Sequence, residues 1–175
     1  MAFETQPWRP FTHAGTAYDL SHLNPRTVVF EVAAKNNKPA LYYTVDVAFG
    51  THCFTHGIPK DGVYDRALEY RDGREVRVFD FRRLELSKAL PAIVETLVGR
   101  KCMHGDRGNF FTIAATDENG TMVDYDVFFT VSKSSQKGRL NLFLQSAYLD
   151  ATLPKPRPIR FEIILFNTLH GRPTR

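Results

Sequence analysis

The apolar positions between residues 86 and 98 have the spacing of one face of an α-helix. They are Leu86, Leu90, Ile93, Val94, Leu97 and Val98. Recurrence at intervals of three and four residues is typical of an amphipathic helix. Ser87 suits the N-cap, Pro91 the first turn, and Gly99 a left-handed C-terminal position. The pattern predicts a main helix over residues 87–98.

After Gly99 the apolar period changes to two, which is typical of β-strands. Four strands are expected, at residues 109–116, 123–133, 139–149 and 159–168. In the last of them, Phe161, Ile163 and Leu165 would face one side and Ile164 the other. An Asn-Gly pair at residues 119–120 and a polar loop at residues 134–138 favour antiparallel connections. The sequence therefore predicts an α+β fold in which a helix precedes a four-stranded antiparallel meander.

The first half of the chain predicts additional N-terminal β-hairpins. Turn formers at residues 35–39 separate expected strands at 27–33 and 40–49, and Asp72-Gly73 separates strands at 68–70 and 75–81. Residues 1–25 are expected to be irregular and to be held to the body by apolar side chains, namely Trp8, Phe11, Tyr18 and Leu20. We interpret residues 1–175 as one domain. It comprises a β-rich elaboration (1–83), the helix-plus-sheet core (84–168) and a basic tail (169–175).

Composition narrows the class of protein. The 14 Phe and 7 Tyr argue against disorder. No apolar run reaches the roughly 18 residues of a membrane helix, and the first residues lack the pattern of a signal peptide. Two cysteines, Cys53 and Cys102, are too few for a framework of disulfides. These features predict a cytoplasmic protein that does not associate with membranes.

The net charge of +4 is concentrated near the C-terminus. Residues 151–175 carry five Lys or Arg and one Glu, whereas the first 150 residues are neutral overall. A basic segment favours an anionic partner such as RNA. Prolines would hold Lys155, Arg157 and Arg160 in an extended stretch that could follow a phosphate backbone. A rigid loop between strands with a solvated tail explains the same residues equally well.

Two histidines near the end of the second expected strand suggest acid–base chemistry. Metal-independent RNA cleavage needs a base, an acid and a cation that stabilises the charged phosphorane. In an extended segment, His52 and His56 would share one side about 7 Å apart. We treat both as catalytic candidates, with Lys133 as the phosphate contact and Lys137 and Arg139 as further nucleic-acid contacts. The alternative is that both histidines are hydrogen-bonded loop residues.

The same histidines could belong to a zinc site. His52, Cys53 and His56 form one group, and Cys102 and His104 form another, so a pair from each would supply four nitrogen or sulfur ligands. No established zinc spacing is matched, and we assign neither a metal nor a cofactor. A zinc-stabilised domain remains an alternative. Cys53 is a poor candidate for a nucleophile activated by His52, because adjacent strand residues face opposite sides.

The order of one helix and four antiparallel strands resembles the core of small ribonucleases. Residues 128–133 and 142–148 look like the paired central strands of phage-borne RelE-like toxins and of the wider barnase, EndoU, colicin and RelE grouping. The resemblance covers residues 84–168 and carries over no catalytic residue. It implies a metal-independent endoribonuclease or toxin-like nuclease of a bacterial mobile element, acting on RNA. The alternative is a non-catalytic module that binds protein or nucleic acid, and the oligomeric state stays open.

Overall fold

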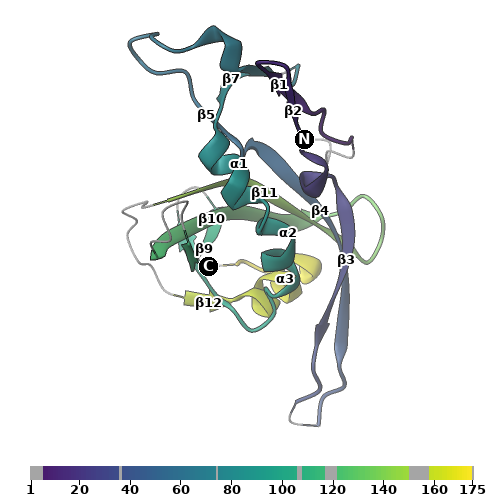
Figure 1. Ribbon diagram of the computed structural model, residues 1–175. Coiled ribbons are helices and arrows are strands. Elements are labelled where there is room, and N and C mark those ends of the chain that lie inside the picture. The colour runs from purple at the N-terminus through teal and green to yellow at the C-terminus, as the bar shows by residue number, and fades with distance from the viewer. Residues whose placement is uncertain are drawn as a thin grey trace.

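A seven-stranded sheet forms the body of the computed structural model, which describes residues 6–35, 37–73, 75–105, 108–116, 122–149 and 158–174. The strand order is β12-β8-β9-β10-β11-β4-β3 (Figure 1). The strands are β3 (Arg26–Val32), β4 (Leu41–His52), β8 (Lys101–Gly105), β9 (Gly108–Thr116), β10 (Met122–Lys133), β11 (Arg139–Leu149) and β12 (Pro158–Arg160). β8 to β11 form an antiparallel meander, β11 pairs with β4 in parallel, and β3 pairs with β4 as an antiparallel hairpin.

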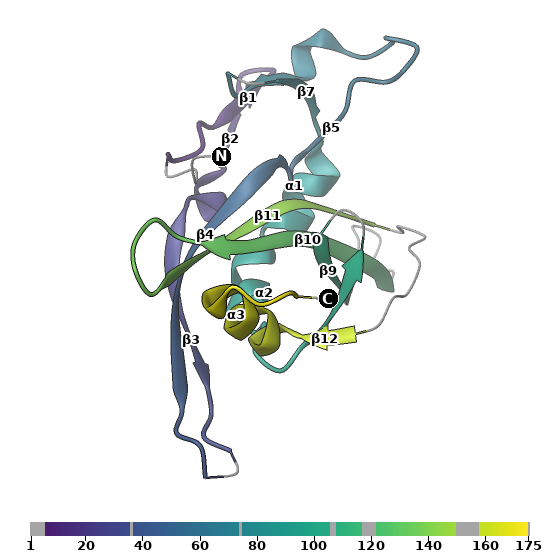
Figure 2. The ribbon, with the colours of Figure 1, turned by 180° about the vertical axis from the view of Figure 1, so that it is seen from behind.

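Three short helices pack against the curved sheet (Figure 2). They are α1 (Phe81–Ser87), α2 (Leu90–Glu95) and α3 (Phe161–His170). α3 contacts β10 and β11, and α1 contacts β11. The helices and alternate residues of β4, β10 and β11 enclose the hydrophobic core, which includes Val45, Val47, Phe49, Val127, Phe129, Leu142, Leu144, Leu90, Val94, Ile164 and Leu165. None of the helices in the described part of the chain is long and apolar enough to cross a bilayer.

The predicted main helix is bent into α1 and α2 and begins earlier than expected. Asp80 is the N-cap of α1, because its side chain accepts a hydrogen bond from the backbone N–H of Arg83 at 3.0 Å. Ser87 is not a cap, since its buried hydroxyl donates to the carbonyl of Leu84 at 2.7 Å. Pro91 lies in the first turn of α2, as predicted. The predicted apolar face is buried at Leu90, Ile93, Val94 and Leu97.

The prediction of a strand at residues 159–168 is wrong, because this segment forms α3 after the short strand β12. Phe161, Ile164 and Leu165 are fully buried, whereas Ile163 is 44% exposed. Those spacings of three and four fit a helix, and a short apolar run does not distinguish the two structures by periodicity alone. β8, at residues where no strand was predicted, supplies the fourth strand of the meander. The α+β class, the single domain and the antiparallel meander are confirmed.

The N-terminal hairpins are confirmed, and two features add to them. β6 (Glu69–Arg71) and β7 (Val76–Phe79) pair as predicted, and β5 (Thr55–His56) joins β7 to give a three-stranded sheet. Residues 6–25 are less irregular than expected, since β1 (Phe11–His13) and β2 (Thr16–Tyr18) form a small hairpin before the 3-10 turn η1 (Ser21–Leu23). A second 3-10 turn, η2 (Arg66–Leu68), precedes β6. Phe11 and Leu20 are buried, and Trp8 and Tyr18 pack against the core, as predicted.

Gly50 lies at an irregularity in the pairing of β4 with β11. The parallel register with β11 shifts between Leu144 and Ser146, and a Cβ on Gly50 would lie 2.7 Å from the backbone oxygen of Gln145. The approach of β11 at the bulge therefore requires glycine. A tight turn follows, in which the N–H of Cys53 donates to the carbonyl of Gly50 at 3.0 Å. Residues 52–56 are consequently not one extended segment.

Candidate functional site

Polar side chains converge where the chain passes from β4 of the large sheet to β5 of the small one. We call Thr51, His52, Thr55, Glu75 and Arg77 the junction cluster. One carboxylate oxygen of Glu75 accepts a hydrogen bond from the Thr51 hydroxyl at 2.9 Å and lies 3.2 Å from His52 Nε2. Its other oxygen accepts from Arg77 at 3.2 Å, and Arg77 Nε donates to the Thr55 hydroxyl at 2.7 Å. The cluster thus ties the end of β4 to the segment that enters β7.

The electrostatics of the junction cluster leave His52 neutral and Glu75 ionised near pH 7. Burial, and then the positive charge of Arg77, lower the pKa of His52. Partial burial raises the pKa of Glu75, but hydrogen bonds from Thr51 and Arg77 outweigh it and the net shift is downward. An ionised Glu75 fixes the histidine proton on Nε2 and leaves Nδ1 as the acceptor. The His52 side chain is 44% exposed, so it can accept a proton from solvent or a ligand.

His56 does not share a side with His52. In the pairing of β5 with β7, Thr55 is opposite Phe79 and His56 is opposite Val78. Because successive strand residues face opposite sides, His56 lies on the other face of the small sheet from Thr55 and the junction cluster. His56 Nδ1 lies 2.8 Å from the carbonyl of Gly57. The turn after His52 is the reason that the expected same-side arrangement does not form.

Lys133 lies far from His52. The register places Ser146 of β11 beside His52, and it places Leu140 of the same strand opposite Lys133. Six residues of β11 separate those two positions, or about 20 Å of strand. The structure therefore does not bring the three predicted catalytic residues, His52, His56 and Lys133, into one site.

The predicted nucleic-acid contacts are also dispersed. Arg139 forms an ion pair with Asp46 and donates to the Thr27 hydroxyl at 3.1 Å, so its guanidinium is engaged within the sheet. Arg160 lies 3.8 Å from the carboxylate of Glu162. Lys137 is exposed in the loop between β10 and β11. Lys155 and Arg157 lie outside the described residues.

Both cysteines behave as core residues. Cys53 and Cys102 are fully buried, and burial raises the pKa of each thiol to about 12. Over the described ranges, no group of three or more His, Cys, Asp or Glu side chains could hold a metal ion. The side chain of His104 lies outside what the structure describes. Inert, buried thiols fit packing better than metal binding or nucleophilic chemistry.

A second candidate site is the hairpin of β3 and β4, which we call the arm. Figure 1 shows it running beyond the body of the molecule. At its base, Phe30 is buried and packs against Phe161, with ring centroids 5.1 Å apart. Val29 is 59% exposed and Tyr42 is 64% exposed, on the face that also carries Glu31. The sequence predicts the hairpin but does not predict that it extends beyond the body. Because Val28 and Val29 are adjacent in a strand, one of the two apolar side chains has to face outward.

Comparison with known proteins identifies the family of this chain. A family model described as YjaZ family matches residues 10–169. The chain belongs to the YjaZ family. It is 28% identical over 175 residues to Protein YjaZ of Escherichia coli (strain K12), an alignment that covers 98% of this chain and 96% of that relative. No solved structure matches the chain. The family match spans both the junction cluster and the arm.

Proposed function

We propose that this member of the YjaZ family is a non-catalytic protein-binding module, and that the arm is its docking surface. The observation that carries the proposal is the position of β3 at one end of the sheet order, beside exposed apolar side chains. An edge strand presents backbone N–H and C=O groups that can pair with an extended segment of a partner. The arm thus combines a backbone template with apolar contacts.

Exposed apolar area supports the same surface. Val29 and Tyr42 are 59% and 64% exposed on one face of the arm, and Leu41 is 44% exposed on the other face. Clustered exposed apolar residues mark interaction sites more often than scattered ones do. The engagement of Arg139 by Asp46 within the sheet favours a protein partner over nucleic acid. An aromatic residue such as Tyr42 is also typical of protein interfaces.

Crosslinking at single positions tests this proposal. A photoreactive amino acid at Val29 should capture a partner in cells, whereas the same residue at Val63, which is 76% exposed outside the arm, should not. The captured protein is then purified, and its affinity is measured for the wild type, Val29→Lys and Val63→Lys. Loss of affinity only in Val29→Lys supports the arm, because an edge lysine opposes strand pairing. Equal capture at both positions, or equal affinity of both variants, contradicts the proposal.

We propose metal-independent RNA cleavage as a second candidate function, with His52 as the base. The supporting observation is a half-exposed imidazole whose Nε2 lies 3.2 Å from the Glu75 carboxylate. A carboxylate that orients a histidine in this way is typical of general-base pairs. The test is incubation of mixed RNA with purified protein in EDTA. Cleavage that His52→Ala abolishes and His56→Ala retains supports it, and intact RNA with every variant contradicts it.

A further inference from the structure

We infer that the partner of the arm is a second copy of this chain, paired through antiparallel β3 strands about a two-fold axis at Val29. This inference rests on the proposed binding function, because it uses the same edge. Two copies of the large sheet would then form one continuous sheet across the axis. A strand edge is self-complementary in this way, since each antiparallel partner supplies both donors and acceptors.

The edge of β3 lacks the usual protections against such pairing. Proteins commonly blunt an edge strand with proline, a central lysine or a β-bulge. β3 contains no proline or lysine, and its register with β4 runs without a shift from Arg26 to Val32. Its charged residues, Arg26 and Glu31, lie toward the two ends. β3 is the last strand in the order of the large sheet, and Figure 1 shows it forming the arm together with β4.

The side chains favour a register with the axis at Val29. Val29 is the middle residue of β3, so an axis there pairs the whole strand with itself and buries two valines that are 59% exposed in one copy. Neutral Thr27 then faces Glu31 of the second copy, and Arg26 faces Val32. An axis at Val28 would instead bring Glu31 opposite Pro25, which has no N–H to donate. The Val29 register places no like charges opposite each other.

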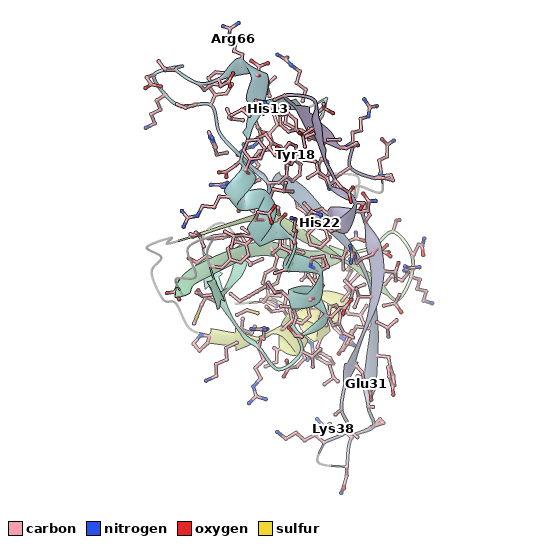
Figure 3. All side chains as sticks on the ribbon, in the orientation of Figure 1. His13, Tyr18, His22, Glu31, Lys38 and Arg66 are labelled. Atoms are coloured by element: carbon pink, nitrogen blue, oxygen red, sulfur yellow. The ribbon has the colours of Figure 1, made fainter. Side chains whose placement is uncertain are left out.

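Charges beyond the strand agree with this register. Antiparallel pairing directs the tip of each arm toward the start of β3 in the other copy, where η1 lies. Figure 3 labels Lys38 at the tip and His22 in η1, with Glu31 between them. The tip carries the exposed lysines Lys35 and Lys38, and the segment before η1 carries the exposed carboxylate of Asp19. Opposite charges would therefore approach at both ends of the paired strands.

Sedimentation equilibrium of the purified full chain tests the inference. The wild type should dimerise, Val29→Lys should be monomeric because two lysines would meet at the axis, and Val63→Lys should remain dimeric. In Val29→Cys, mild oxidation should link the dimer, since opposite Cα atoms lie about 4.5–5.5 Å apart, a span that disulfides accept. The buried native thiols would not compete, and Val63→Cys controls for random collision.

The outcomes separate this inference from the proposal on which it rests. A wild type that stays monomeric at its highest soluble concentration overturns the second copy as partner. If Val29→Lys still loses affinity for a captured protein in that case, the arm remains a docking surface for a different chain. A dimer that persists in Val29→Lys overturns the edge as the interface. If Val29→Lys still dimerises and still binds the captured protein with wild-type affinity, both the inference and the proposed binding function are overturned.

Discussion

Truncation of Ile164 provides a direct test of α3, because its two neighbouring isoleucines differ in burial. Ile164 is fully buried in the core, whereas Ile163 is 44% exposed. An alternating strand over the same residues would reverse that order, since Ile163 would share the inner face with Phe161 and Leu165. Two substitutions of identical chemistry at adjacent positions therefore distinguish the helix from the strand.

The expected difference in the free energy of unfolding is large. Ile→Ala removes three carbons, which is about 2.4 kcal/mol of transfer free energy at a fully buried site. The cavity left behind brings the cost for Ile164→Ala to about 2–5 kcal/mol. For Ile163→Ala, about half of the transfer term applies, and the higher helix propensity of alanine offsets part of it. We expect that variant to lose about 1 kcal/mol or less.

Urea unfolding followed by circular dichroism measures both values. The two variants should unfold with equal slopes against urea, so that their midpoints report stability alone. Phe166→Leu in the same helix serves as a conservative control, since a partly buried aromatic is replaced by another apolar residue. Greater destabilisation by Ile163→Ala than by Ile164→Ala would refute the helical assignment. Equal losses would refute the difference in burial.

Three further predictions concern the junction and the cysteines. Gly50→Ala should lower the free energy of unfolding in urea by about 1–3 kcal/mol, because overpacking a site costs about that much. Gly57→Ala should be near neutral, because no atom lies within 4 Å of its new Cβ. Similar values for the two variants would contradict the crowding at Gly50. The folded pKa of His52 lies below its unfolded value of 6.5, so the unfolded chain binds more protons and stability should fall as pH drops below 6.5. His52→Gln should flatten that dependence, and an unchanged slope would contradict it. Cys53 and Cys102 should react with a thiol reagent only after denaturation, and rapid reaction in the native protein would contradict their burial.

The chemistry of the junction could be anticipated only in part. His52 stands out in the sequence because histidine titrates near neutral pH. Its partner Glu75 is 23 residues away, immediately before β7 in a separate hairpin, so nothing local links them. The expected pairing with His56 assumed an extended segment, whereas the turn that begins at Gly50 sends the two imidazoles to different faces. Lys133 was grouped with them by residue type, and strand register then placed it about 20 Å along the sheet from His52.

Local pattern alone determined the β3–β4 and β6–β7 hairpins, three strands of the meander (β9, β10 and β11) and the α+β class. Each of these features depends on residues that are near one another in the sequence. They are the alternation over residues 123–133 and 139–149, turn residues such as Asp72-Gly73, and the helical face of Ile93, Val94 and Leu97. Only the tertiary structure decided that residues 161–170 are helical, that β11 joins β4 in parallel, and that β3 ends the sheet. These outcomes depend on contacts between distant segments, such as Phe30 with Phe161, whose free energy overrides local preference.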